Sequence, residues 1–230
     1  MTKQNIKRNI NMIRIGLLAA LVLLSVACQE KEKKHVLPFI GHYDVVEKEV
    51  NGEKVEDTVY PTIPPFAYLN QDSVMISSEA MKGKIWIADF FFTSCLTICP
   101  KMTSQMKRLS TMTKDLEKEI QFMSFSINPD IDQPSRLRSY IKHFGIEANN
   151  WYFFTGKEED IHFLGDKHFL VNARPDLGSQ GGYAHSEAFV LVDREGYIRG
   201  MYNGTDTEEV NQLEKDLRKL LEHEYGVTGK

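Results

Sequence analysis

The sequence has no hydrophobic run long enough to cross a membrane as a helix. Its N-terminal apolar run, residues 15–26, has 12 residues, whereas a spanning helix needs about 20. Basic residues are also fewer than acidic ones. The 28 Lys and Arg residues are outnumbered by 32 Asp and Glu, a net charge of −4, which argues against nucleic acid as a partner. Cysteine is scarce, with three residues in 230: Cys28, Cys95 and Cys99.

The N-terminal segment has the features of a signal peptide rather than of a membrane span. Four basic residues precede or flank its apolar run, and no acidic residue precedes Cys28. The small residues before Cys28 resemble the lipobox of bacterial lipoproteins, with Ser25 where leucine is usual. We expect residues 1–27 to be removed and Cys28 to carry lipid, which anchors the protein to a membrane of the bacterial cell envelope, outside the cytoplasm. An ordinary signal peptide cut nearby and an uncleaved anchor are the alternatives.

Cys95 and Cys99 follow an apolar stretch that predicts a buried strand. Residues 85–92, IWIADFFF, are mostly β-branched and aromatic, with Asp89 as the one acid, as in a strand covered on both faces. Two polar residues after it can turn the chain, and Pro100 suits the first turn of a helix. The sequence therefore predicts a strand, a sharp turn that carries Cys95, and a helix that begins near Cys99.

The spacing of the two cysteines fits a metal clamp. Residues four apart on a helix have Cβ atoms about 5–6 Å apart, whereas a disulfide prefers about 3.8 Å. Two thiolates that share a soft metal ion at about 2.3 Å need sulfurs only about 4 Å apart. A disulfide between Cys95 and Cys99 stays possible because Cys95 is expected in the flexible turn. The partial positive charge of a helix N-terminus favours thiolate over thiol.

The rest of the chain predicts an α/β protein. Asn51-Gly52 marks a β-hairpin in residues 42–60, with an apolar face expected from Tyr43, Val45, Val50, Val55 and Val59. Apolar periodicity predicts helices at about residues 100–119, 134–144, 157–167 and 207–225, the last capped by Thr207. Strands are expected between the helices, and residues 172–184 are expected to form a long exposed loop.

This order of elements predicts a thioredoxin-like fold. Alternating strands and helices imply a central, mostly parallel sheet flanked by helices, here preceded by an N-terminal β-hairpin extension. We expect a charged tether at residues 28–37, the extension at 38–65 and the thioredoxin-like domain at 66–230. The mature chain of residues 28–230 has 24 basic and 32 acidic residues, so any membrane attachment would come from lipid and not from a basic patch.

Seven histidines are present, and His185 is the best placed to join the cysteines. It lies between the glycine-rich loop and a strand whose start passes beside the cysteine turn in a thioredoxin fold. Two thiolates and one imidazole suit copper, and zinc could use the same groups with a fourth ligand. Met102 and Met106 also lie near the cysteines, but their helical spacing predicts core residues.

The stretch FFFTSCLTICP resembles the F-x-F-T-x-C-x-x-x-C-P signature of the Sco/SenC family. Members of that family are thioredoxin-fold proteins that bind copper and help to assemble cytochrome c oxidase. The resemblance covers about residues 66–225. It implies that Cys95, Cys99 and His185 are copper ligands.

Two positions depart from the family pattern. Residues 128–134, NPDIDQP, resemble the family's D-P-x-x-D-x-P element, with Asn128 in place of the first Asp and Asp132 matching the second. Ala184 stands where the family has Asp before the histidine, which removes a possible partner for the imidazole.

Two functions are consistent with these residues. The first is a copper-binding assembly factor, held by lipid outside the cytoplasm, that passes copper to the copper-site subunit of a membrane respiratory oxidase without enzymatic turnover. The second is a thiol–disulfide oxidoreductase in which Cys95 attacks and Cys99 resolves, although the usual C-x-x-C motif is one residue shorter. A peroxidase is a weaker hypothesis, because its cysteine needs a nearby arginine and the sequence shows none.

Overall fold

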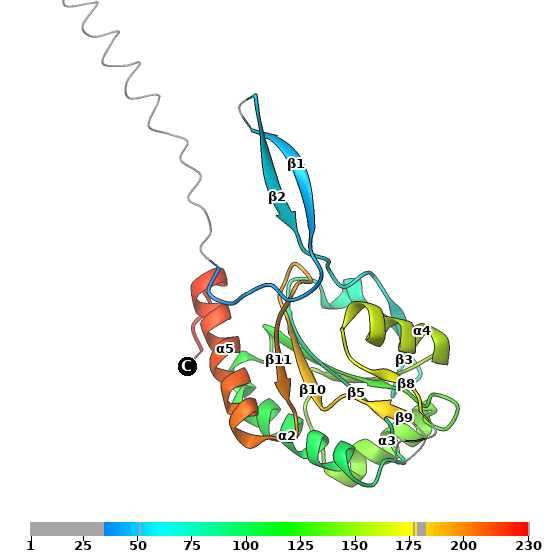
Figure 1. The fold of residues 1–230 in the computed structure, drawn as a ribbon. Helices are drawn as coiled ribbons and strands as arrows, with labels where there is room; N and C mark the ends of the chain where they lie inside the picture. Colours follow the sequence, from blue (N-terminus) through cyan, green and yellow to red (C-terminus); the bar gives the residue numbers. More distant parts are fainter. Residues whose placement is uncertain (1–34, 51, 177, 179–182, 230) are drawn as a thin grey trace, which may run out of the picture. The chain divides into compact units, whose positions relative to one another are not determined.

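A seven-stranded sheet is the centre of this computed structural model, which describes residues 35–50, 52–176, 178 and 183–229 (Figure 1). The strand order is β11-β10-β5-β6-β7-β3-β4. The strands are β3 (Ala67–Asn70), β4 (Met75–Ser77), β5 (Ile85–Phe91), β6 (Ile120–Ser126), β7 (Trp151–Thr155), β10 (Ala188–Val192) and β11 (Ile198–Asn203). All seven residues of β5 are buried, as the apolar run predicts.

The sheet is mixed in direction. β5, β6 and β7 are parallel neighbours, whereas the pairs β10–β5, β10–β11, β3–β7 and β3–β4 are antiparallel. The α/β class and the flanking helices agree with the prediction, but "mostly parallel" describes only the three strands joined by helices. Strands joined by short turns, such as β3–β4 and β10–β11, run antiparallel because a parallel pair needs a long crossover.

Helices cover both faces of the sheet (Figure 1). They are α2 (Ile98–Met112), α3 (Pro134–Phe144), α4 (Glu158–Phe163) and α5 (Thr207–Tyr225), with a π-helical turn η3 (Leu164–His168) and 3₁₀ turns η1 (Ser78–Met81) and η2 (Lys114–Leu116). The Phe91 ring contacts Tyr140 of α3, with centroids 5.3 Å apart. The Phe90 ring contacts Phe169 after η3 at 5.5 Å. Because adjacent residues of a strand point to opposite faces, α3 and η3 lie on opposite sides.

Two helix ends differ from the prediction. α2 ends at Met112, before the expected end near residue 119, and continues as the separate turn η2. The N-cap of α5 is Asp206, whose carboxylate accepts hydrogen bonds from the N–H groups of Glu208 and Glu209 at 2.7 and 3.2 Å. The assignment of Thr207 as the cap is wrong, because Asp206 has the extended backbone of a cap and a charge that suits a helix N-terminus.

The predicted N-terminal hairpin is present as β1 (Asp44–Val50) and β2 (Glu53–Val59). Among the described residues it pairs with no other strand, and every residue of both strands is exposed. The register pairs Val46 with Asp57 and Lys48 with Val55, which places Val46, Val50, Val55 and Val59 on one face and Val45 on the other. The expected apolar face was therefore wrong for Val45.

The segment expected to be a long loop contains a small separate sheet. β8 (Ala173–Pro175) and β9 (Tyr183–His185) form an antiparallel pair in which Ala173 lies opposite His185. The prediction of a loop across residues 172–184 is wrong at both ends of that segment. These short strands are held together by backbone hydrogen bonds, which depend little on the side-chain pattern. The Gly- and Pro-rich sequence can therefore form them without strand periodicity.

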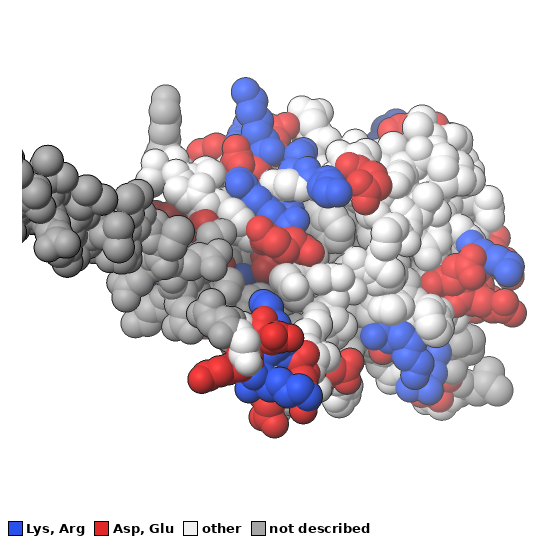
Figure 2. Space-filling model, turned by 90° about the horizontal axis from the view of Figure 1, so that it is seen from above, with Lys and Arg blue, Asp and Glu red and all other residues white. Residues whose placement is uncertain are grey.

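The surface carries charges of both signs. Lys and Arg residues are interspersed with Asp and Glu over the face that Figure 2 shows. In the part of the chain that the structure describes, no helix combines the length and the apolar character that a membrane span requires. The predicted signal peptide and Cys28 lie outside the described residues.

Candidate metal centre

Cys95 and Cys99 lie where the sequence predicts, at the carboxyl end of a central strand. Cys95 is in the turn between β5 and α2, and Cys99 is the second residue of α2. Both are free thiols and both are buried. The Cys99 N–H donates to Cys95 Sγ over 3.5 Å, and the Thr97 hydroxyl lies 3.8 Å from the same sulfur. The sulfur of Cys95 is therefore at the helix N-terminus, where the first N–H groups have no carbonyl partner within the helix.

The two thiols differ strongly in acidity. A hydrogen bond from the Cys99 thiol and others from N–H groups of the helix start lower the pKa of Cys95 to about 4, against the opposing effect of burial. The same hydrogen bond raises the pKa of Cys99, and burial raises it further. These shifts favour a thiolate at Cys95 and a protonated thiol at Cys99, and a bound soft metal ion would displace the Cys99 proton.

Asp132 holds the cysteine turn in place from behind. It is fully buried, and its carboxylate accepts hydrogen bonds from the Thr93 N–H at 2.9 Å, the Thr93 hydroxyl and the Ser126 hydroxyl at 2.6 Å. Arg136 Nε donates to the Thr93 hydroxyl oxygen at 3.0 Å. The sequence marks Asp132 through the family pattern, but its supporting role is visible only in the structure.

Asp89 is a second buried acid on the side of the sheet that α2 covers. The Ser124 hydroxyl donates to it at 2.5 Å, and Trp151 Nε1 donates to that hydroxyl at 2.9 Å. Burial raises the pKa of Asp89 to about 7. The charge of Asp89 also raises the pKa of Cys99. The sequence shows an acid inside an apolar strand, and that mismatch was the available signal for this group.

His185 reaches this end of the fold through β9. Tyr183, two residues earlier on the same strand, packs against Phe92 with ring centroids 5.4 Å apart, and the Cys95 N–H donates to the Phe92 carbonyl at 3.2 Å. The Tyr183 side chain of β9 therefore packs against the residue that precedes the cysteine turn. The side chain of His185 lies outside the described residues. Among the side chains that are described, no three His, Cys, Asp or Glu residues converge as a metal site, so ligation by His185 stays a prediction.

Other candidate ligands belong to the core or to other contacts. Met102 and Met106 are 1% and 0% exposed, which confirms them as core residues of α2. His162 is partly buried, and its Nε2 lies 2.8 Å from the Ile127 carbonyl oxygen, so its ring is held by a backbone contact.

A cavity of about 280 Å³ opens beside Cys95. The turn, the first residues of α2 and one side of α3 line it: Thr93, Cys95, Leu96, Pro100, Arg136, Ser139, Tyr140, His143 and Phe144. Cys99 is not part of this lining. The sequence shows no arginine near the cysteines, but α3 brings Arg136 to the same cavity from a distant part of the sequence.

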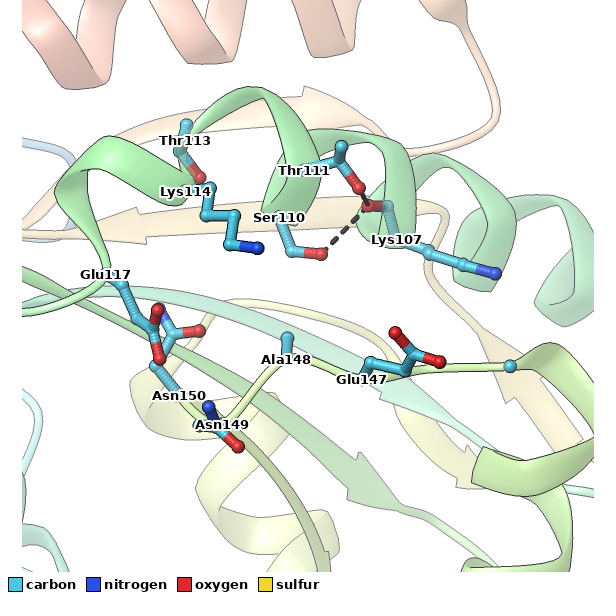
Figure 3. A pocket seen from close by; sticks show the side chains of 11 residues that line it. Lys107, Ser110, Thr111, Thr113, Lys114, Glu117, Glu147, Ala148, Asn149 and Asn150 are labelled. Carbon is cyan, nitrogen blue, oxygen red and sulfur yellow. Dashed lines mark hydrogen bonds between the residues drawn. The ribbon is translucent and has the colours of Figure 1, made fainter. Parts of the chain in front are cut away.

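A second cavity, about 400 Å³ in volume, lies between the end of α2 and residues 145–150 (Figure 3). Its lining contains two lysines, two glutamates and no thiol or histidine. The hydroxyls of Ser110 and Thr111 both donate to the Lys107 carbonyl, as the dashed lines in Figure 3 show. The thiols that suit a soft metal ion are therefore at the cysteine turn and not here.

These features define a thioredoxin-like α/β protein with a pair of thiols at the end of a central strand. The sequence model of the SCO1/SenC family matches residues 55–222, well over half of the chain. The chain belongs to the SCO1/SenC family, which confirms the resemblance found in its sequence.

Solved structures agree with this assignment. A SCO1/SenC family lipoprotein from Bacillus anthracis is 34% identical, with a TM-score of 0.63 over 69% of this chain and 94% of the other. BsSco, a member of the Sco family of cytochrome c oxidase assembly proteins with a disulfide switch, is 31% identical, with a TM-score of 0.62 over 69% and 92%. Bradyrhizobium japonicum ScoI, solved with copper bound, is 22% identical and shares the fold, with a TM-score of 0.55 over 70% and 100%.

Proposed function

We propose that this protein binds copper through Cys95, Cys99 and His185 and delivers it to the copper-site subunit of a membrane respiratory oxidase. The observation that carries the proposal is the pair of free, buried thiols at a helix N-terminus, where the Cys99 N–H donates to the Cys95 sulfur. Soft sulfur ligands with an imidazole suit copper. Further support comes from BsSco, a cytochrome c oxidase assembly protein, and from ScoI, which was solved with copper.

The residues around the cysteines have separate roles in this proposal. Cys95 offers an ionised sulfur, and Cys99 loses its proton when the metal binds, so copper uptake releases a proton. Asp132 and Arg136 keep the turn in position through Thr93. Delivery proceeds by ligand exchange, in which a thiolate of the acceptor replaces one ligand of this protein at the copper ion.

Anaerobic titration of the purified protein with Cu(I) tests the ligand set. We expect one copper per chain, and an affinity that His185→Ala lowers by at least about tenfold. His42→Ala removes a histidine that is exposed and serves as the matched control. An unchanged affinity in His185→Ala would remove His185 from the site.

The lipid anchor at Cys28 has its own test. We propose that the mature protein is held in the cell envelope by this lipid, as the Bacillus anthracis relative is a lipoprotein. Cys28→Ser is expected to shift the protein from the membrane fraction to the soluble fraction. Retention of Cys28→Ser in the membrane fraction would show that the N-terminal apolar segment itself is the anchor.

A thiol–disulfide oxidoreductase is the second candidate, and the difference in acidity between the thiols favours it. The Cys95 thiolate would attack a partner disulfide, and Cys99 would then displace the partner, which leaves with two thiols while this chain keeps a disulfide. Rapid reduction of protein disulfides that depends on Cys95, together with copper affinity insensitive to His185→Ala, would favour this function over copper delivery.

A further inference from the structure

The cavity beside Cys95 is the feature that the proposed function leaves unexplained. Cys95 is only 5% exposed, and this cavity of about 280 Å³ borders it, whereas Cys99 does not line it. We propose that the cavity receives an extended peptide segment of an acceptor protein, in which an apolar side chain and an acidic side chain flank the cysteine that exchanges with Cys95. This inference rests on the proposed function, since exchange requires an acceptor thiol to reach the site.

The size and the lining of the cavity favour an apolar side chain. Pockets for drug-sized ligands occupy about 300–1,000 Å³, so this cavity suits one or two side chains. Pro100, Tyr140 and Phe144 contribute apolar surface to it. Leu96 also lines it and, at 89%, is the most exposed of the large apolar side chains that the structure describes. A side chain that enters the cavity would cover Leu96.

The charge of the lining favours an acidic neighbour. Arg136 and His143 line the cavity, and no Asp or Glu does. Arg136 forms no ion pair with any residue that the structure describes, and its Nε is fixed by the Thr93 hydroxyl at 3.0 Å. The whole chain has a net charge of −4, so this basic rim differs from the average surface. A carboxylate of the acceptor would therefore find, beside the exchanging sulfur, a guanidinium that has no ion pair among the described residues.

Thiol exchange with short peptides tests the proposal without copper. One probe peptide carries Leu and Glu beside a cysteine that is joined by a disulfide to thionitrobenzoate, and the other carries Ser and Lys at those positions. The Cys95 thiolate attacks the peptide sulfur, a Cys95–peptide disulfide forms, and thionitrobenzoate leaves with the electron pair. Its colour gives the rate. The protein carries Cys28→Ser, so that Cys95 and Cys99 are its only thiols.

We expect the Leu-Glu peptide to react about tenfold faster than the Ser-Lys peptide. Arg136→Glu should remove or reverse this preference, and Leu96→Ser should reduce it. Leu96 is so exposed that its replacement does not disturb the fold, so this variant tests the cavity even if Arg136→Glu perturbs the turn. Lys142→Glu is the matched control, because it makes the same charge change on an exposed position of α3 outside the cavity.

Equal rates for both peptides, a preference that survives both cavity variants, or no reaction with either peptide would overturn the docking site. A preference that depends on Arg136 and Leu96 would support the docking site even if the protein bound no copper. Failure of the proposed function would therefore be distinguishable from failure of the docking site. If a second copy of this chain occupied the cavity, sedimentation velocity would show a dimer, and Leu96→Ser would dissociate it. Such a dimer would also overturn the peptide proposal.

Discussion

Two buried carboxyl groups near the cysteines have different surroundings. Asp132 accepts hydrogen bonds from the Thr93 N–H, the Thr93 hydroxyl and the Ser126 hydroxyl, so it holds the cysteine turn. Asp89 accepts one from Ser124, and its burial raises its pKa to about 7. Asp132 is thus a positioning residue for the turn, and Asp89 is a group whose protonation changes near neutral pH.

Asp89→Asn is expected to change the pH dependence of stability. Because the pKa of Asp89 is raised from 3.8 to about 7 on folding, the folded protein binds the proton more tightly than the unfolded chain does. This group therefore lowers the free energy of unfolding as pH rises from about 4 to about 7, by up to about 4 kcal/mol at 1.36 kcal/mol per pKa unit. Asparagine carries no charge, so the difference in unfolding free energy between pH 5 and pH 8 should shrink in Asp89→Asn. Urea unfolding of both proteins at the two pH values measures it, and identical pH profiles would contradict it.

Asp132→Ala is expected to loosen the cysteine turn. The substitution leaves the Ser126 hydroxyl without its acceptor in a buried site, where an unpaired group costs about 1–3 kcal/mol. The Thr93 N–H and hydroxyl also lose their acceptor, but they are half-buried and cost less. We expect a loss of about 2–4 kcal/mol in the free energy of unfolding and a weaker affinity for Cu(I). Asp130→Ala removes a neighbouring acid that is exposed and should change neither quantity by much. Equal stability of the two variants would show that Asp132 does not hold the turn.

Sequence reasoning succeeded at residues whose placement depends on their neighbours in the chain. Cys95 and Cys99 were predictable because a buried strand, a turn and a helix start fix them within one short stretch. Arg136 was missed because α3 brings it to Cys95 only after β6 has paired with β5. The contact is a property of the assembled sheet, and no local pattern records it.

At the scale of elements, the N-terminal hairpin shows what local signals can and cannot decide. Asn51-Gly52 correctly predicted two paired strands. The face that each valine occupies depends on the register of the pairing, because a shift of one residue moves every side chain to the other face. The same limit explains β8 and β9, whose pairing uses backbone groups in a segment without strand periodicity. It also explains Asp206, since both Asp206 and Thr207 can cap a helix and only the backbone angles choose between them.

Replacing residues 44–59 with a short Gly-Ser linker is expected to leave the rest of the domain folded. All residues of β1 and β2 are exposed, so the hairpin buries little apolar surface, and an isolated hairpin is marginally stable in water. A shorter connection also costs little loop entropy. We expect a change below about 1 kcal/mol in the free energy of unfolding and an unchanged copper stoichiometry. A much larger loss, measured by denaturant unfolding, would mean that the hairpin is part of the folding unit.

At the scale of the whole molecule, a buried ionic cluster joins three distant parts of the chain. Arg199 of β11 is fully buried and donates to Asp193 at 2.9 Å and to Glu224 of α5 at 2.6 Å. It also donates to the carbonyl oxygens of Leu37 and Pro38 at 2.7 and 3.2 Å. Residues 35–37, expected as the end of a free tether, are therefore packed into the domain. The charge pattern of residues 29–35 suggested a tether, but His35 and Val36 contact Glu224, near the opposite end of the sequence.

Glu224 receives several of these contacts at once. The Val36 N–H donates to it at 2.9 Å, and the His35 ring nitrogen Nδ1 lies 3.0 Å from it. Burial alone would raise its pKa, but the hydrogen bonds from Arg199, His35 and Val36 together lower the pKa of Glu224 to about 2. The carboxylate therefore stabilises the fold above the ordinary pKa of glutamate, and that contribution is lost as pH falls toward 2. The first described residues depend on this group for their position.

Arg199→Met is expected to be the most destabilising of the substitutions considered, because it leaves the carboxylates of Asp193 and Glu224 buried without their cation. Loss of one partner of a buried ion pair costs about 3–5 kcal/mol, which denaturant unfolding measures. The segment before β1 loses two carbonyl contacts as well, so limited proteolysis should cut it faster.

Lys82→Met removes an exposed ion pair with Glu79 and should cost less than about 1 kcal/mol. Folded Arg199→Met should still bind one copper per chain, since the described contacts of Arg199 involve neither the cysteine turn nor α3. If Arg199→Met is as stable as Lys82→Met, the cluster does not hold the N-terminal segment, and the tether would extend to residue 37 as its charge pattern first indicated.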